Sequence, residues 1–332
     1  MTALLRVQDL CVRFRTMGQL KAFATGTKAP FIDAVCGVSF EIRKGETLAL
    51  VGESGSGKST IARTIIGLQR AVSGSINFDG QEIEELKGAD RKPYLRRMAM
   101  MFQDPIGSLS PRLTVRSLLT EPFRIHGLKD RDAGGEAERL LRMVGLPGDF
   151  ARRYPHQLSG GQARRVGIAR ALALKPDLII ADEPTAGLDV SVQGEVLNLL
   201  ARLQDELGMA ILIISHNLNV VRHMTDRMAI MYLGRFIEVG STERIFDQPR
   251  HPYTEALLAA NPEPDPDAVL NRIELKGEVP SLMRRPSGCE FHTRCRCAQD
   301  ICHRVFPEAS ASAGDNERSF RCHFPLEPET AP

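Results

Sequence analysis

The chain has 332 residues, of which 42% are apolar and 25% charged, and its formal net charge is only +2. This composition is typical of a globular protein with one large domain and a smaller one. The small net charge excludes the broad basic surface on which nucleic-acid-binding proteins usually depend. No apolar run approaches the roughly 18 residues that cross a bilayer, and the N-terminus lacks the long apolar segment of a signal peptide. We therefore expect a cytoplasmic protein that reaches a membrane only through a partner.

The predicted elements alternate between strands and helices. Apolar residues at helical spacing follow the glycine-rich loop after residue 51, fill much of 112–156, and recur from 162 to about 174 and in 192–207. One more helix is expected at 253–260, after the composition becomes rich in proline near residue 246. The alternation predicts an α/β fold with a largely parallel sheet. Strand patterns cover residues 4–15, 32–42, 48–51, 73–78, 98–103, 178–183, 210–215, 227–232 and 235–238.

The glycine-rich loop carries the clearest chemical signal. Its spacing, Gly52-x-x-x-x-Gly57-Lys58-Ser59, is that of a phosphate-binding P-loop. Glycines let the backbone N–H groups wrap an anion, and the helix that begins near Lys58 points its positive end at the same place. Lys58 would add charge beside the phosphates, and Ser59 a hydroxyl ligand for Mg²⁺. The alternative is a glycine-rich turn without a ligand. The residues predicted to bind ATP here are Gly52, Glu53, Ser54, Gly55, Ser56, Gly57, Lys58, Ser59 and Thr60.

Polar side chains end the successive strands that follow the P-loop. The strand at 178–181 runs into Asp182 and Glu183, a Walker B pattern in which Asp182 holds Mg²⁺ through water and Glu183 polarises the attacking water. His216 ends the next strand, and Gln103 ends the strand before the helical section. Because ligands of open α/β sheets bind at these strand ends, their joint presence favours a catalytic site over polar residues that merely end strands. The predicted catalytic residues are Lys58, Gln103, Glu183 and His216, and the predicted Mg²⁺ ligands are Ser59, Gln103 and Asp182.

Residues 158–162 read LSGGQ and lie between Gln103 and Asp182. This pentapeptide resembles the signature of the ABC (ATP-binding cassette) ATPases, and the order and spacing of the motifs match that family over about 1–245. The resemblance implies a P-loop NTPase fold of ABC type, with a RecA-like, mainly parallel sheet, an antiparallel β subdomain and a helical subdomain at about 104–165. It also implies that the signature completes the nucleotide site of a second cassette. The further ATP contacts that it implies are Ser159, Gly160, Gly161, Gln162, the D-loop residue Asp189, and Phe14, or alternatively Phe31, stacked on adenine.

Other segments resemble the ATPases of oligopeptide/dipeptide (peptide/nickel) importers. They are Phe102-Gln103-Asp104-Pro105, residues 186–193 and His251-Pro252-Tyr253-Thr254. The resemblance implies a subunit that hydrolyses ATP to energise import of di- or oligopeptides or related small solutes. The alternative, a soluble ABC ATPase acting on nucleic acid or the ribosome, usually carries two cassettes, a long coiled-coil insertion or a basic arm, and none is found in this sequence.

The same resemblance implies partners and a location. Polar residues 17–30 resemble the F-type ATPase of these systems, which pairs with a different, D-type chain; pairing with itself is the alternative. Two membrane permease subunits would hold the pair at the cytoplasmic face of the inner membrane. A periplasmic binding protein would act indirectly, and no nucleic acid is expected.

Apart from Cys11 and Cys36, the cysteines lie within residues 289–322. Their spacing, Cys289-x₅-Cys295-x₆-Cys302-x₁₉-Cys322, is wider than the tight pairs that usually begin zinc sites and suits an iron–sulfur cluster held by four thiolates. The segment resembles the tail of the peptide-importer ATPases, which implies a [4Fe–4S] cluster. Zinc and no metal are the alternatives, and Cys297 and His292 are alternative ligands. We assign residues 246–332 to a small, irregular, Cys-rich C-terminal domain.

Overall fold

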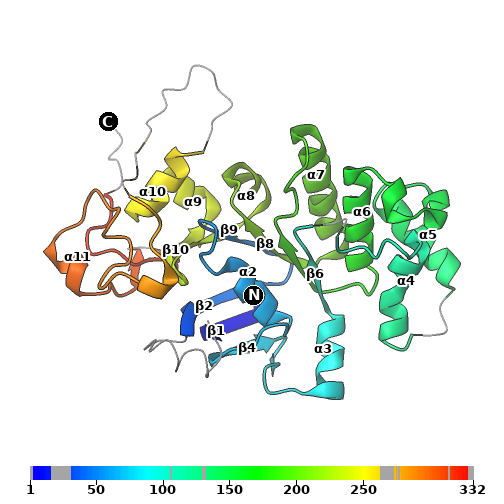
Figure 1. Cartoon of the computed structure of the whole chain (residues 1–332), viewed down its shortest axis with the longest axis horizontal. Helices are drawn as coiled ribbons and strands as arrows, with labels where there is room; N and C mark the ends of the chain where they lie inside the picture. The colour runs from blue at the N-terminus through cyan, green and yellow to red at the C-terminus, as the bar shows by residue number, and fades with distance from the viewer. Residues whose placement is uncertain are drawn as a thin grey trace, which may run out of the picture. The chain divides into compact units, whose positions relative to one another are not determined.

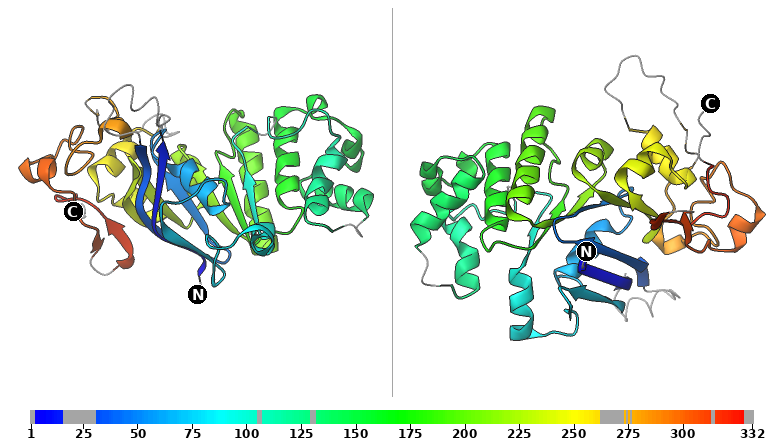
Figure 2. Two further views of the ribbon diagram at one scale, coloured as in Figure 1. Left: turned by 60° about the horizontal axis from the view of Figure 1, so that its bottom comes forward. Right: turned by 180° about the vertical axis from the view of Figure 1, so that it is seen from behind.

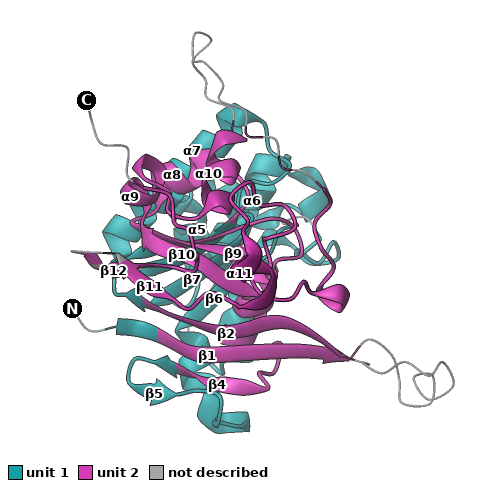
Figure 3. Ribbon diagram, turned by 90° about the vertical axis from the view of Figure 1, so that its left-hand side faces the viewer, with its two compact units in different colours: residues 1–5, 42–47, 77–214 teal, residues 6–41, 48–76, 215–332 magenta. Residues whose placement is uncertain are grey.

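The computed structural model describes residues 3–15, 31–104, 107–128, 132–261, 273, 275, 277–312 and 315–327. The chain divides into two compact units, which Figure 3 shows in different colours. Unit 1 comprises residues 1–5, 42–47 and 77–214, and unit 2 comprises residues 6–41, 48–76 and 215–332. The polar residues 17–30 lie outside the described residues, and the predicted boundary at residue 246 remains a prediction.

Unit 1 is built on parallel strands. β7 (Leu178–Asp182) lies between β6 (Met98–Met101) and β8 (Ala210–Ser215), with Leu178 opposite both Met98 and Ala210. Every residue of β7 and β8 is buried. Their continuous apolar sequences therefore fit strands that are covered on both faces. β6 ends at Met101, so Gln103 does not end the strand as predicted but lies two residues beyond it.

Helices α4 to α7 accompany these strands, as Figure 1 shows in green. α6 packs on β6, α4 and α7, and α4 also packs on α5. The side chains of Thr114 and Asp132 cap the starts of α4 and α5, and the backbone of Gly208 ends α7 with a left-handed φ of +65°. The predicted helical section at 112–156 is confirmed. The helices of this unit are α3 (Lys92–Arg96), α4 (Val115–Ile125), α5 (Ala133–Met143), α6 (Gly160–Ala171), α7 (Val190–Leu207) and the 3₁₀ helices η1 (Gly88–Arg91), η2 (Gly148–Arg152) and η3 (Pro155–Gln157).

The first strands of the chain form an antiparallel layer. In unit 2, β1 (Ala3–Arg15) lies between β2 (Phe31–Arg43) and β4 (Ser73–Phe78), and Figure 2 shows the three side by side. In unit 1 the end of β4 turns at Asp79-Gly80 into β5 (Gln81–Glu82). These strands confirm the expectations for 4–15, 32–42 and 73–78.

A further group of paired strands in unit 2 includes the strand before the P-loop. β3 (Thr47–Val51) pairs in parallel with β9 (Arg227–Tyr232), and β9 pairs in antiparallel with β10 (Arg235–Ser241). Beyond β10 lies a hairpin that the sequence did not indicate. Its strands are β12 (Asp315–Phe320), which pairs with β10, and β11 (Ser310–Ser312).

The core of unit 2 joins the P-loop strand to the C-terminal segment. Val51, Tyr232, Tyr253 and Phe291 belong to one buried apolar cluster, and the Tyr253 ring lies 4.9 Å from that of Tyr232 and 5.3 Å from that of Phe291. Among the described residues, no helix is long and apolar enough to cross a membrane. The helices of this unit are α2 (Lys58–Ile65), α8 (Leu218–Met224), α9 (Thr242–Asp247), α10 (Pro252–Ala259), α11 (Asp300–Arg304) and the 3₁₀ helix η4 (Leu282–Arg284).

Candidate nucleotide-binding site

The P-loop connects β3 to α2 in unit 2, and two glycines determine its path. Gly52 and Gly57 have φ values of +151° and +106°, which side chains rarely tolerate. A Cβ on Gly57 would lie 2.5 Å from the carbonyl oxygen of Ala34, and one on Gly52 would collide with the carbonyl oxygen of Met231. The loop can therefore be built only with glycine at these positions.

Lys58 begins α2 with its charge inside the loop. Its side chain is 7% exposed, and Nζ donates hydrogen bonds to the carbonyl oxygens of Gly52 (2.7 Å) and Glu53 (2.9 Å) and to Ser56 Oγ (3.2 Å). Gly57 is the N-cap of α2, and no side chain caps this helix. The positive helix end and the ammonium group together provide the anion site that the motif predicts.

Glu53, which the sequence assigned only to the loop, has two contacts with the C-terminal segment. Its carboxylate accepts hydrogen bonds from both terminal nitrogens of Arg294, at 2.9 and 3.0 Å. Its backbone N–H donates to the hydroxyl of Tyr253 at 3.1 Å. Neither partner was among the predicted site residues, because no local pattern links residues so far apart in the sequence.

The Walker B residues end β7 in unit 1. Asp182 is 5% exposed, as expected at the end of a covered strand. Glu183 follows with a left-handed φ of +52°, and its N–H donates to the carbonyl oxygen of Ile214 at 2.9 Å. A left-handed conformation is unfavourable for glutamate, and residues held in this way are frequent at functional sites.

A buried arginine of α6 stabilises the segments around two other predicted residues of unit 1. Arg164, 2% exposed, donates to the carbonyl oxygens of Gln103 (3.3 Å) and Ala186 (2.8 Å). Burial lowers the pKa of the Arg164 guanidinium. The residue lies two positions after the signature, so α6 links the signature to the segment of Gln103 and to the turn that leads to Asp189, the exposed N-cap of α7.

The signature folds as the capped start of α6. The hydroxyl of Ser159 accepts the N–H of Gln162 at 3.3 Å, and the Gln162 side-chain oxygen accepts the N–H of Ser159 at 3.0 Å. This reciprocal pair is a capping box. Gly160 and Gly161 form the first turn, and a Cβ on Gly161 would lie 3.0 Å from Val192.

His216 is exposed and directly follows β8. The next residue, Asn217, caps α8 by accepting the N–H groups of Asn219 (3.0 Å) and Val220 (3.4 Å). The ABC ATPases that the sequence resembles usually have Asp at this position, and Asn serves equally well as an N-cap. This departure therefore leaves the helix that follows His216 intact.

The two candidates for adenine stacking, Phe14 and Phe31, are both exposed, at 39% and 44%. The guanidinium groups of Arg13 and Arg15 lie over the Phe31 ring, 5.8 and 5.5 Å from its centroid. Phe14 is thus the candidate whose ring has no such cation–π contact among the described residues, and its role remains a prediction.

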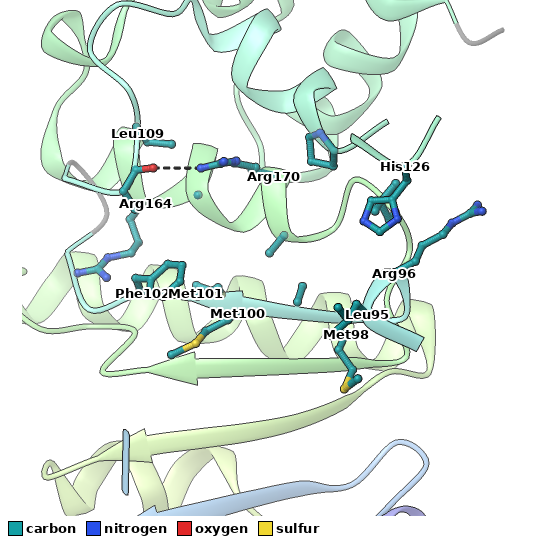
Figure 4. A pocket seen from close by; sticks show the side chains of 16 residues that line it. Leu95, Arg96, Met98, Met100, Met101, Phe102, Leu109, His126, Arg164 and Arg170 are labelled. Carbon is teal, nitrogen blue, oxygen red and sulfur yellow. Dashed lines mark hydrogen bonds between the residues drawn. The ribbon is translucent and has the colours of Figure 1, made fainter. Parts of the chain in front are cut away.

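A cavity of about 240 Å³ lies in unit 1 among β6, α4 and α6 (Figure 4). Figure 4 shows Arg170 donating to a backbone oxygen beside Leu109; this is Ser108 O, at 3.0 Å. Burial, together with the charges of Arg96 and Lys92, lowers the pKa of His126. The lining combines apolar with cationic side chains, namely Leu95, Met98, Met101, Leu109, Pro122 and Leu174 with Arg96, Arg164 and Arg170.

The predicted cluster cysteines gather in unit 2. Cys289 and Cys302 belong to the apolar cluster of this unit, and Cys295 packs against it. Burial, together with the neighbouring thiols, raises the pKa of Cys295 to about 11 and that of Cys322 to about 12. Within the described residues, however, no group of three or more His, Cys, Asp or Glu side chains is arranged to hold a metal ion.

Comparison with known proteins identifies the family. Residues 35–186 match the ABC transporter family, and residues 237–302 match the C-terminal region of oligopeptide/dipeptide transporters. The chain is 49% identical to the oligopeptide transport ATP-binding protein AppF of Bacillus subtilis, covering 85% of this chain and 87% of that protein. It is 44% identical to the putative oligopeptide transport ATP-binding protein YkfD of the same organism, with 95% and 96% covered. The chain belongs to the family of oligopeptide-transport ABC ATPases.

Solved structures support the same fold. The ATP-binding cassette MJ0796, in a dimeric post-hydrolysis state with ADP and phosphate, is 28% identical and superposes with a TM-score of 0.63, covering 72% of this chain and 98% of that chain. The cbiO1 protein of Clostridium perfringens is 27% identical with a TM-score of 0.61, covering 74% and 91%. The P-loop ABC ATPase fold is confirmed, and with it ATP hydrolysis coupled to transport as the activity of this oligopeptide-transport ABC ATPase.

Proposed function

We propose that this chain is the ATP-hydrolysing subunit of a membrane importer for di- or oligopeptides or related small solutes. The P-loop carries this proposal, because its glycines and buried Lys58 form an anion site that serves no evident purpose without a nucleotide. The peptide-transport names of the relatives support the substrate class.

In this proposal the residues of the P-loop bind the phosphates of ATP, and Phe14 stacks on adenine. Ser59, Gln103 and Asp182 would hold Mg²⁺, which neutralises phosphate charge when it is bound. Their hydroxyl, amide and carboxylate oxygens are the ligands that this ion prefers. Glu183 orients or deprotonates the attacking water, and His216 stabilises charge on the γ-phosphoryl group. Ser159 to Gln162 complete the site of a second cassette, and Asp189 connects the two sites.

Glu183 provides the test of hydrolysis. Replacing Glu183 with Gln preserves the size of the side chain but removes its basicity, so turnover should fall by about 10³-fold or more while ATP binding persists. Steady-state phosphate release would measure turnover. Gel filtration with ATP would show whether the Glu183→Gln variant accumulates as an ATP-bound dimer, as we expect. Undiminished hydrolysis would contradict the role given to Glu183.

We further propose that the chain pairs with a different, D-type ATPase at the cytoplasmic face of the inner membrane. A cytoplasmic helix of a permease subunit would then dock over the cavity of unit 1 and insert side chains into it. Its apolar lining and the nearby arginines suit an apolar helix that carries an acidic residue. Arg96→Glu should weaken co-purification with the permease about tenfold without changing ATP affinity. The control is Arg142→Glu, a change in an exposed arginine of α5; equal effects of the two variants would contradict this docking site.

The four thiols Cys289, Cys295, Cys302 and Cys322 are proposed to hold a [4Fe–4S] cluster, within the Cys-rich C-terminal domain. Four thiols are the donor set that such a cluster requires, and three of them lie in or against one apolar cluster. A bound cluster would link separate segments of the chain, a structural role. Anaerobic purification with iron and sulfide assays tests this, with Cys302→Ser losing iron and Cys11→Ser retaining it. Zinc or an iron-free tail would contradict it.

A further inference from the structure

The C-terminal segment contacts the P-loop through a partly buried ion pair. Arg294 lies far beyond the P-loop in the sequence, but its side chain reaches the loop residue Glu53. The Arg294 side chain is only 7% exposed, and that of Glu53 is 25% exposed. The two groups form a bidentate pair, with nitrogen–oxygen distances of 2.9 and 3.0 Å. Two parallel charge-assisted hydrogen bonds fix the orientation of a carboxylate as well as its position. Arg294 therefore restricts where Glu53 can lie.

Tyr253 restrains the same residue through the backbone. Its ring is fully buried between those of Tyr232 and Phe291, which leaves the hydroxyl little freedom. That hydroxyl accepts the N–H of Glu53 at 3.1 Å. Side chain and main chain of Glu53 are thus both bound by residues that follow the ABC core in sequence.

On its other side, Glu53 contacts the phosphate-binding lysine. The carbonyl oxygen of Glu53 accepts a hydrogen bond from Lys58 Nζ at 2.9 Å. Glu53 is therefore the residue that links Arg294 to Lys58 through hydrogen bonds. A shift of Glu53 would move a carbonyl group that orients the lysine, within a loop whose N–H groups must converge on the phosphates.

Charge gives the contact a second effect. A carboxylate in the loop that receives a polyphosphate repels the ligand, and the interaction between unit charges about 10 Å apart in a partly buried site changes affinity by about tenfold. The guanidinium of Arg294 compensates the negative charge of Glu53 within the ion pair. Without Arg294, Glu53 would be both mobile and negative beside the bound nucleotide.

We propose that Arg294 is a positioning residue for ATP binding, acting through Glu53 on the P-loop and Lys58. The inference rests on the proposed role of the P-loop as the ATP site. It gives the C-terminal segment a direct part in nucleotide affinity, so that a change in this segment alters ATP binding without touching the nucleotide.

The test compares two arginine variants of the full chain. Arg294→Met should raise the Kd for Mg-ATP, measured by calorimetry, and the KM for ATP by about tenfold, with kcat changed less than twofold. The matched control is Arg296→Met, which removes a 54%-exposed arginine paired with Glu255 at 2.6 Å in the same segment. It should leave both constants unchanged. A merely structural role of Arg294 would lower the active fraction and kcat instead.

A double-mutant cycle with Glu53→Gln separates coupling from general damage. Arg294→Lys keeps the positive charge, so in the Glu53→Gln background, where no carboxylate is left to position, it should change the Kd for ATP less than about 1.5-fold, compared with about threefold in the parent chain. Additive effects of the two changes would overturn the proposal. If Arg294→Met unfolds, Arg294→Lys keeps the charge without the bidentate geometry and should raise the Kd about threefold; a wild-type Kd would again overturn it. Lys58→Ala is the reference: if it retains ATP binding, the P-loop assignment itself fails, independently of Arg294.

Discussion

Two helices of this chain begin at glycine-rich loops, and they begin in opposite ways. α2 starts at Gly57 in a left-handed conformation, and no side chain caps it. α6 starts at Ser159, and the capping box with Gln162 satisfies the first N–H groups from within the chain. The P-loop is therefore left for a ligand to complete, whereas the signature is already complete as a helix start. This difference agrees with the proposal that the first loop binds its own phosphate and the second presents its exposed surface to another cassette.

The largest expected effect comes from placing a side chain at the start of α2. Gly57→Ala introduces left-handed strain of about 1–2 kcal/mol and a Cβ close to Ala34, so the loop must move. We expect ATP affinity to fall by about 100-fold or more, as measured by calorimetry. The control is Gly194→Ala in the interior of α7, where a Cβ meets nothing within 4 Å. It should bind ATP normally and gain about 1 kcal/mol of helix stability. Normal affinity in Gly57→Ala would remove the distinction between the two helix starts.

A smaller effect is expected at the start of α6. Ser159→Ala removes the capping oxygen and should lower the free energy of unfolding by about 1 kcal/mol, measured by urea denaturation. Ser159→Asn keeps a side-chain acceptor and should be nearly as stable as the parent chain. Equal stability of the Ala and Asn variants would show that the capping box contributes nothing and that α6 is as open as α2.

An effect that appears only on acidification concerns a third helix, which begins at a titratable cap. His251 is buried at the start of α10, and its Nδ1 accepts the N–H of Tyr253 at 3.0 Å. Burial lowers the pKa of His251 from 6.5 to about 3. Below pH 6.5 His251 is therefore protonated in the unfolded chain but stays neutral in the folded chain. Because the unfolded state binds the extra proton, the free energy of unfolding decreases as pH falls from 6.5 toward 3. His251→Asn keeps the cap without titrating. Its loss of unfolding free energy between pH 6.5 and 5 should be smaller by about 1.5 kcal/mol. Parallel pH curves for the two proteins would contradict this.

The elements that follow local patterns were predictable, and those that depend on distant partners were not. Continuous apolar runs predicted β7 and β8, and the glycine spacing predicted the P-loop and the start of α2. The end of β6 was placed too late, because MAMMFQ stays apolar past the point where pairing with β7 stops. The hairpin of β11 and β12 was missed, since its polar residues lack alternation. Arg294 and Glu53, 241 residues apart, share no pattern that a sequence could reveal.

The hairpin at the end of the chain closes over a carboxylate that water does not reach. Glu238 is 0% exposed and accepts hydrogen bonds from the N–H groups of Arg250 and His251 and from the guanidinium of Arg318. Removing one partner of such a buried pair typically costs about 3–5 kcal/mol. A shortened protein that ends before residue 318 keeps every nucleotide-binding motif but loses the guanidinium that pairs with Glu238. Truncation at this end should therefore lower the free energy of unfolding even where it leaves the nucleotide-binding motifs intact.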